Sequence, residues 1–271
     1  MRDFDADKFV YYMTGRTLEK GCFAGTEELG DELLCADRLS AKTLFEEVSF
    51  KLYSGEVLGI TGLLGSGRSE LAKALFGMVP LSGGEIRIAG QPVRLCTVRD
   101  AIRSGISYVP EDRLTEGLFL PHSISRNIAV GAFHKFFNRA GFLRQKKLDE
   151  TVRHWIDELK IVTPSGELPA QALSGGNQQK VVIAKWLEND PKILILNSPT
   201  VGVDIGSKAD IHACARKLAR QGMGVIIISD DISEIMQNCS RVLVMKKGRI
   251  VSEHKVSQLT EAELSQQLRE D

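Results

Sequence analysis

The chain has no long hydrophobic run. Its longest aliphatic stretches, such as residues 225–228 (VIII), are short, whereas a helix needs roughly 20 apolar residues to cross a bilayer. The residues after Met1 (RDFDAD) are mostly charged, so the apolar core of a secretion signal is lacking as well. The sequence therefore predicts a chain that neither spans a membrane nor begins with an export signal.

Cysteine is scarce, and the charge of the chain is balanced. The five cysteines are odd in number and show no CxxC spacing, which argues against a disulfide framework or a zinc site. They are Cys22, Cys35, Cys96, Cys214 and Cys239. We expect free thiols in a reducing compartment. Lys+Arg and Asp+Glu both total 35, so the net charge of +0 gives no support to general nucleic-acid binding.

What the 271 residues do contain is a succession of strand-like and helix-like segments. Strands are predicted at residues 48–52, 57–60, 193–196 and 225–228, hairpins at 85–95 and 242–251, and helices at 69–76, 148–159 and 208–220. The helix at 208–220 lies between two aliphatic strands, which implies a parallel sheet with a right-handed crossover.

The remaining segments complete the predicted organisation. Residues 1–30 contain glycines that break any regular pattern, as in a linker or the tail of a preceding domain. One domain then runs over residues 31–271, with helical periodicity at about 116–185 and a terminal helix over 258–270. The predicted fold class is α/β, with a parallel core sheet, an antiparallel β flank and a helical subdomain.

A glycine-rich loop follows the strand 57–60. Residues 62–69 (GLLGSGRS) fit the pattern G-x-x-x-x-G-K-[ST] at every fixed position but one, between a strand and a helix. Glycines let backbone N–H groups turn toward a phosphate, and the helix N-terminus adds partial positive charge. The loop therefore predicts a nucleotide-phosphate site, with a merely structural turn as the alternative. The predicted ligands are Gly62, Gly65, Ser66, Gly67, Arg68 and Ser69.

Two residues of this loop carry specific expectations. Ser69 would offer its hydroxyl to a magnesium ion. Arg68 stands where the pattern has lysine. It keeps the positive charge, but its planar guanidinium would reach a phosphate with a different geometry from a compact ammonium.

Residues 173–180 read LSGGNQQK. This octapeptide resembles the signature motif of ATP-binding cassette (ABC) ATPases, in the form common in bacterial sugar importers. In that family the signature completes an ATP site whose other half lies on a second cassette. The resemblance implies that a hydroxyl and backbone N–H groups, at a helix beginning near Asn177, hold the partner's γ-phosphate. The residues so implied are Ser174, Gly175, Gly176 and Gln178.

The strand 193–196 lacks the acidic pair that usually follows it in this family. The resemblance implies an aspartate that holds Mg²⁺ and a glutamate that activates water, but this chain has Asn197 and Ser198. Asn197 can still bind a metal-bound water, although it brings no negative charge, and Ser198 cannot act as a carboxylate base. Losing a positioned general base costs roughly 10²–10⁴-fold in rate, so the chain's own site is expected to hydrolyse ATP poorly.

Other positions follow the order of the family's motifs. Glu111 stands where many members have a metal-sensing glutamine, and Asp204 matches the aspartate of the D-loop. Asp230 occupies the usual place of the switch histidine, where an ionised carboxylate would repel a γ-phosphate. Phe45 lies near the position of the aromatic residue that stacks on adenine in many members.

The whole pattern is similar to the C-terminal cassette of tandem ATPase subunits in ribose-, galactose- or arabinose-type importers, and residues 8–19 resemble the end of the first cassette. The resemblance implies ATP and Mg²⁺ as cofactors and a peripheral position on the cytoplasmic face of the membrane. The implied partners are a second cassette in the same polypeptide, permease subunits and, indirectly, a periplasmic or extracellular solute-binding protein.

Two alternatives remain open beside that interpretation. The chain could be a nucleotide-free scaffold half of an ATPase dimer, although the intact glycines argue against it. It could also be an ABC protein of DNA repair or translation, but the long insertions usual in those proteins are lacking. The sequence does not indicate which sugar or other solute is carried.

Overall fold

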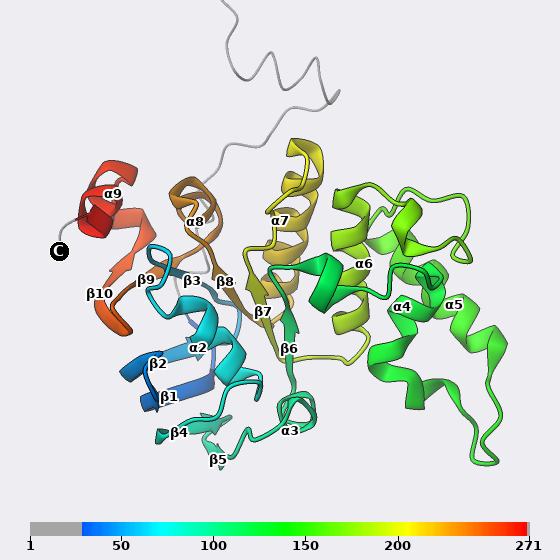
Figure 1. Ribbon diagram of the computed structural model, residues 1–271, viewed down its shortest axis with the longest axis horizontal. Coiled ribbons are helices and arrows are strands. Elements are labelled where there is room, and N and C mark those ends of the chain that lie inside the picture. Colours follow the sequence, from blue (N-terminus) through cyan, green and yellow to red (C-terminus); the bar gives the residue numbers. More distant parts are fainter. Residues whose placement is uncertain (1–28, 270–271) are drawn as a thin grey trace, which may run out of the picture.

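The structure is a computed structural model that describes residues 29–269. Most of the predicted linker 1–30, and all of the segment 8–19, therefore lie outside the described residues. In the described part, two sheets lie on one side of the molecule and a group of helices lies on the other (Figure 1).

The larger sheet has six strands in the order β10-β9-β3-β8-β7-β6. They are β3 (Val57–Thr61), β6 (Ile106–Val109), β7 (Ile193–Asn197), β8 (Gly224–Ile228), β9 (Arg241–Lys246) and β10 (Arg249–Lys255). All neighbours are parallel except β9 and β10, which form the predicted hairpin. Every residue of β3, β6, β7 and β8 is buried, as expected of aliphatic runs in a covered parallel sheet, so the predicted core sheet is confirmed.

The smaller sheet is antiparallel and has the order β2-β1-β4-β5. Its strands are β1 (Glu32–Ala41), β2 (Phe45–Tyr53), β4 (Gly83–Ile88) and β5 (Gln91–Val93). The strand β1 was not predicted. Its register with β2 and β4 shifts near Arg38, which has a φ of 48°, and such a bulge breaks the alternation by which a strand is identified in a sequence.

The helices surround the larger sheet and extend beyond it. They are α2 (Arg68–Leu75), α3 (Val98–Arg103), α4 (Ile124–Ala129), α5 (Gln145–Glu158), α6 (Gly175–Leu187), α7 (Ile205–Arg220), α8 (Ile232–Asn238) and α9 (Glu261–Arg269). Four short helical turns join them, namely η1 (Arg113–Gly117), η2 (Val130–Phe136), η3 (Ala170–Ala172) and η4 (Val256–Gln258). None of the helices between residues 29 and 269 is long and apolar enough to cross a membrane.

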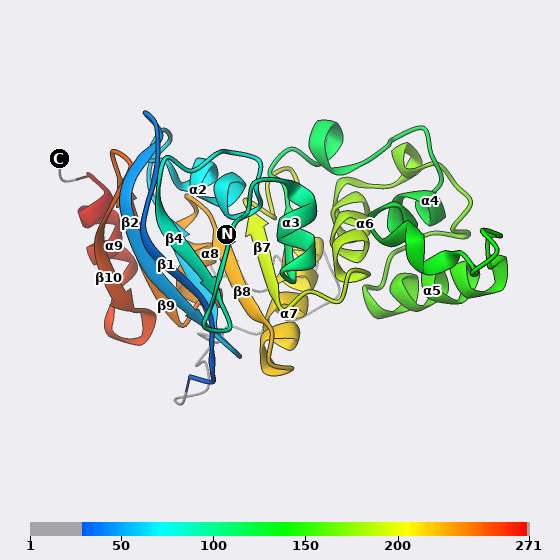
Figure 2. The same ribbon diagram turned by 90° about the horizontal axis from the view of Figure 1, so that it is seen from below.

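The region predicted to be helical, about 116–185, contains α4, α5 and most of α6 (Figures 1 and 2). Here α4, η2, α5 and η3 are called the helical arm. The arm packs on α6, and α6 in turn packs on α7 and β6 of the core. The bounds proposed for this subdomain, and for the domain as a whole, remain predictions.

The topology gathers chemistry at one edge of the parallel sheet. In an open parallel sheet, loops at the carboxyl ends of neighbouring strands lie side by side and form the binding crevice. Here β3 is paired with β8, and β8 with β7, so that Ile60, Ile228 and Asn197 stand in register. The three loops that follow these strands carry the glycine-rich segment, Ser198 and Asp230.

Candidate functional site

The glycine-rich loop lies between β3 and α2 and needs its glycines. Gly65 has a φ of 80°, and a side chain there would meet nothing within 4 Å, so its backbone borders open space. Gly67 ends the loop at the N-terminus of α2 with a φ of 93°, and a Cβ there would lie 2.7 Å from the carbonyl oxygen of Leu44. Gly62 is also enclosed, because its Cβ would lie 2.5 Å from the carbonyl oxygen of Met245. The loop is therefore held between the turn that joins β1 to β2 and the end of β9, while Gly65 stays open.

The cation of the loop is buried and already engaged. Arg68 is 6% exposed. Its Nη1 donates to the carbonyl oxygen of Gly62, and its Nη2 lies 3.4 Å from the carboxylate of Asp230. Asp230, which was expected only to repel a phosphate, thus forms an ion pair with the loop's own guanidinium.

Ser69 and Asn197, two of the three predicted magnesium ligands, are in contact. Ser69 Oγ donates to Asn197 Oδ1 at 3.4 Å. Asn197 Nδ2 in turn donates to the hydroxyl of Tyr108 at 3.1 Å, which turns the amide oxygen toward Ser69. Burial raises the pKa of Tyr108 to about 12, against the hydrogen bond from Asn197, and negative charge on Glu116 and Glu111 adds to the rise. Tyr108 was not among the site residues predicted from the sequence.

Ser198 lies in a strained and enclosed position. It is 3% exposed, has a φ of 47°, and its backbone N–H donates to the carbonyl oxygen of Ile228. No group of three or more His, Cys, Asp or Glu side chains that could hold a metal ion occurs among residues 29–269. Glu111, the predicted metal-sensing residue, is exposed on the loop after β6. A carboxylate base and a carboxylate metal ligand are therefore lacking at residues 197 and 198.

The site contains buried polar atoms without a protein partner. Six buried side-chain nitrogen or oxygen atoms in the described part lack a hydrogen bond within the protein. Four of them border this edge of the sheet: Thr61 Oγ1, Ser66 Oγ, Arg68 Nε and Ser198 Oγ. Buried polar groups normally find partners, so such a cluster fits a polar, anionic ligand such as a nucleotide phosphate.

The fit to magnesium is weaker than the fit to phosphate. Mg²⁺ prefers six hard oxygen ligands and is usually bound by one or two carboxylates together with substrate phosphates. Ser69 Oγ and Asn197 Oδ1 are suitable oxygen donors, but both are neutral. The ion would therefore be held chiefly by the nucleotide's own phosphates.

The signature segment begins α6, which starts at Gly175 and not near Asn177 as predicted. Helix formation starts earlier because Ser174 caps the helix: its Oγ accepts from the Asn177 N–H and from Asn177 Nδ2. A Cβ on Gly176 would overlap the hydroxyl of Ser207, and one on Gly175 would lie 2.8 Å from the carbonyl oxygen of Gly202. The two glycines therefore also permit close packing on the loop before α7 and on the first turn of α7.

Gln178 and Asp204 support the ends of α6 and α7. Gln178 is buried, and its Nε2 donates to the carbonyl oxygen of Ala170 at 3.3 Å, which ties α6 to the helical arm. Asp204 caps α7 by accepting from the N–H of Ser207 at 2.9 Å. Hydrogen bonds from the backbone and the side chain of Ser207 lower the pKa of Asp204. The predicted roles of both residues toward nucleotide remain predictions.

Arg113 and Glu234 brace the loops of the site, and neither was among the site residues predicted from the sequence. The Arg113 guanidinium donates to the carbonyl oxygens of Val201 and Gly202 at 2.7 and 3.0 Å. Buried Glu234 accepts from Thr200 at 2.9 Å and from the ring of His212 at 2.7 Å. Burial opposes ionisation of Glu234, but His212 and the hydroxyl donors outweigh it and lower the pKa of that carboxyl.

The structure brings some of the predicted residues together and leaves others apart. Residues 62–69 lie with Asn197, Ser198 and Asp230 at one edge of the sheet. The signature begins α6, which Figures 1 and 2 place on the far side of β7 from α2. No hydrogen bond or ion pair joins the two groups within the described chain. Phe45 is 4% exposed and packs in the core between the sheets, so its predicted stacking on adenine is wrong.

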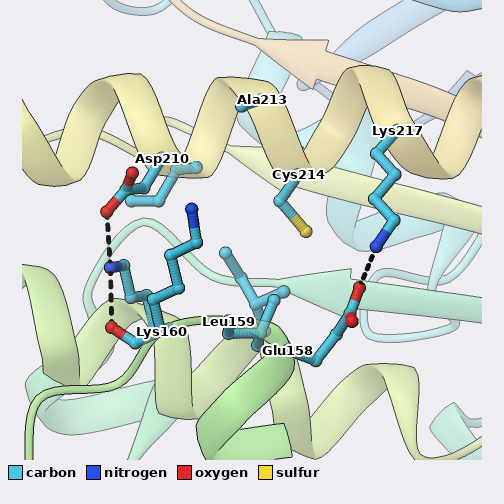
Figure 3. Close-up of a pocket in the computed structure, with 10 residues that line it drawn as sticks. Glu158, Leu159, Lys160, Asp210, Ala213, Cys214 and Lys217 are labelled. Atoms are coloured by element: carbon cyan, nitrogen blue, oxygen red, sulfur yellow. Dashed lines mark hydrogen bonds and ion pairs between the residues drawn. The ribbon is translucent and has the colours of Figure 1, made fainter.

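A small cavity of about 190 Å³ lies behind the signature helix, between α5, α6 and α7 (Figure 3). Lys180, the last residue of the octapeptide, is enclosed there, with a side chain 6% exposed. Its Nζ donates to Asp210 Oδ2 at 2.7 Å and to the carbonyl oxygen of Lys160 at 3.2 Å. At the other end of the cavity Lys217 forms an ion pair with Glu158. These contacts join the arm to the core.

Replacing Lys180 by methionine is expected to lower the free energy of unfolding by about 3 kcal/mol, because Asp210 would lose a buried cationic partner. Lys217→Met is the matched control, since it also removes one lysine from the cavity between α5, α6 and α7 but breaks a more exposed ion pair. We expect a clearly smaller loss of unfolding free energy for this variant. Urea denaturation of both variants measures the difference. Equal losses would show that burial of the Lys180–Asp210 pair adds nothing to its contribution to the free energy of unfolding.

The chain was compared with known proteins. The family described as ABC transporter matches residues 45–201. The chain is 38% identical over 265 residues to a putative ribose/galactose/methyl galactoside import ATP-binding protein of Rhizobium etli, covering 98% of this chain and 49% of the relative. It is 41% identical over 250 residues to the ribose import ATP-binding protein RbsA of Geobacillus kaustophilus, covering 92% of this chain and 50% of the relative.

A solved structure supports the fold independently. A dimeric ATP-binding cassette in a post-hydrolysis state, bound to ADP and Pi, superposes with a TM-score of 0.71 at 20% identity. The match covers 83% of this chain and 99% of that one. The chain spans about half the length of the curated relatives it matches. Cassettes of this kind bind ATP with Mg²⁺. By its family match, its relatives and its fold, the chain belongs to the ATP-binding domains of ABC transporters.

Proposed function

We propose that this chain is the second nucleotide-binding domain of a tandem sugar-import ATPase, and that it donates its signature to a partner cassette while its own site hydrolyses ATP poorly. The observation that carries the proposal is the contrast between the signature segment and the phosphate loop of this chain. The signature helix is intact, capped and packed, whereas the phosphate loop faces Asn197 and Ser198 in place of carboxylates.

The start of α6 is suited to a phosphate on another molecule. The helix has 13 residues, so its N-terminus carries a partial positive charge and free N–H groups. Ser174 is exposed there, although its oxygen also caps the helix. The nearby Val201 and Ile205, on the loop before α7 and at its start, are 53% and 45% exposed. This exposed, partly apolar surface favours contact with a facing cassette. The similarity of the fold to that of a cassette solved as a dimer supports such a contact.

The chain's own site would bind nucleotide but turn it over slowly. The loop N–H groups, Arg68 and the unpartnered hydroxyl of Ser66 would hold the phosphates, and Ser69 with Asn197 would provide two neutral oxygens for Mg²⁺. When bound, Mg²⁺ would neutralise phosphate charge. Neither Asn197 nor Ser198 can accept a proton from an attacking water, so the residues here position nucleotide without activating water.

The other partners would meet the helical arm. A groove of about 550 Å³ on the arm is lined by apolar and polar side chains, among them Phe119, Phe133, Leu143 and Arg126. Phe119 is 55% exposed and Phe133 43% exposed. Permease subunits of a sugar importer are the partners proposed for this face. They would place the domain at the cytoplasmic face of the membrane, with a solute-binding protein acting through the permease.

The nucleotide-free scaffold is the second candidate, and one observation favours it. Arg68 has two partners within the chain, the carbonyl oxygen of Gly62 and the carboxylate of Asp230, which a phosphate would have to compete with. Calorimetric titration with ATP and with ADP, each with Mg²⁺, separates the two functions. Binding of either nucleotide at millimolar concentration supports the proposed domain. No binding of either nucleotide supports the scaffold.

Arg68→Ala is expected to weaken nucleotide binding about tenfold to a hundredfold, because a charge-assisted contact to phosphate is lost. Arg68→Lys keeps the charge and is expected to stay within about threefold of the unchanged chain. Calorimetry measures both, and thermal unfolding checks that each variant is folded. A steady ATPase rate in the isolated chain that is comparable to an intact transporter, and that Arg68→Ala abolishes, would contradict the proposed weak site.

A further inference from the structure

The ion pair between Arg68 and Asp230 places a negative charge inside the phosphate site. Arg68 begins α2 and is buried, whereas Asp230 follows β8 and its side chain is 63% exposed. Among residues 29–269, Arg68 is the charged group that the Asp230 carboxylate contacts. The arrangement results from the strand order, because β3 and β8 are neighbours and their carboxyl ends open onto the same crevice.

The neighbours of Asp230 are committed to other contacts. Asp231 caps α8, where its carboxylate accepts from the N–H of Glu234 at 3.2 Å. Ser229 is buried, and its hydroxyl accepts from the N–H of Asp231 at 3.1 Å. Glu234 is buried against His212 and Thr200. Asp230 is therefore the acidic side chain of this segment that is directed to the phosphate loop.

The position of Arg68 decides which phosphate would meet that charge. In a loop of this pattern the basic side chain reaches the β- and γ-phosphates, while backbone N–H groups hold the α- and β-phosphates. The Asp230 carboxylate lies 3.4 Å from Nη2 of the guanidinium, and Nη1 donates to the carbonyl oxygen of Gly62. A third phosphate would therefore need a cation that Asp230 already engages. Two phosphates can use the loop N–H groups without displacing Asp230.

We infer that Asp230 makes this phosphate loop select nucleoside diphosphates over nucleoside triphosphates. The inference rests on the proposed function, in that the loop binds nucleotide at all. Asp230 competes with a terminal phosphate for Arg68, and like charges a few ångströms apart repel in a partly enclosed site. Asn197 and Ser198 bring no acidic group to recruit a metal ion, so the chain offers little to offset that repulsion.

The selection also gives the domain a defined state in the proposed dimer. With a diphosphate held by the loop, Arg68 keeps Asp230 as its partner, and that pair keeps α2 joined to the loop after β8. The site would then serve as a stable, occupied half of the interface, while the signature of this chain acts on the partner's triphosphate.

The test compares the affinities of ADP and ATP for four forms of the full chain, measured by calorimetry without metal and with Mg²⁺. The variant is Asp230→Asn, which removes the charge and keeps the shape. The control is Asp231→Asn, which removes a charge one residue away and still caps α8. Asp230→Ser serves as a second variant, and thermal unfolding verifies that all forms are folded.

We expect the unchanged chain to bind ADP more tightly than ATP. In Asp230→Asn and Asp230→Ser the affinity for ATP should rise about tenfold or more, while that for ADP changes by less than about threefold. Asp231→Asn should leave the ratio of the two affinities as it was. Tighter binding of ATP than ADP by the unchanged chain, or an equal change for both nucleotides in the Asp230 variants, would overturn the inference alone. Failure of all forms to bind either nucleotide would overturn the proposed function as well.

Discussion

A chain carrying Arg68→Lys, Asn197→Asp, Ser198→Glu and Asp230→His is expected to hydrolyse ATP roughly 10²–10⁴ times faster than the unchanged chain. The four changes supply a compact cation, a charged magnesium ligand and a general base, and they remove the carboxylate that pairs with Arg68. Two copies of this variant can face each other, because each also has an intact signature. Phosphate release, measured as a function of chain concentration, should rise more steeply than linearly while the dimer is dilute.

The same variant with Asp230 left unchanged provides the matched control. It has the base and the metal ligand, but the loop still carries a negative charge beside the terminal phosphate, so its gain in rate should be smaller. Ser198 has a φ of 47°, and the four-change variant keeps a side chain in that strained position. A variant that folds and binds MgATP yet shows no gain in rate would contradict the view that the missing carboxylates are what limit this site.

Ser174→Asp is expected to lower hydrolysis at a facing phosphate loop by about 10²–10³-fold, while Ser174→Asn has a far smaller effect. Aspartate and asparagine both accept a hydrogen bond at the start of a helix, so each should keep α6 capped as Ser174 does. Only aspartate adds a negative charge where the helix N-terminus would meet a phosphate.

The four-change variant of the chain provides the assay, because its activity would depend on the signature of a second copy. The ADP affinity of the chain's own loop should be the same in both Ser174 variants, since the loop and the signature are not in contact within one chain. Equal loss of activity in Ser174→Asn would indicate that the cap, and not the charge at a phosphate, explains the effect. Unaltered activity in Ser174→Asp would exclude signature donation.

Several predicted features depend on spacing along the chain, and these agree with the structure. The aliphatic runs at 193–196 and 225–228 form buried parallel strands, because a covered sheet leaves no polar face. The glycine spacing of 62–69 marks a strand-to-helix loop, since Gly65 and Gly67 adopt positive φ values. By contrast, β1 was missed where its bulge near Arg38 interrupts the alternation. Phe45 was misplaced because a motif position does not reveal which way a strand turns its side chains.

The sequence by itself determined what chemical groups are available. Asn197 and Ser198 cannot supply a carboxylate whatever the fold, and the octapeptide 173–180 carries its resemblance in consecutive residues. Only the tertiary structure decided which of these groups meet. Arg68 and Asp230 looked like two separate departures from a pattern, and they form one ion pair because the sheet sets β3 beside β8. Contacts of that kind depend on strand order, which brings together residues that lie far apart along the chain.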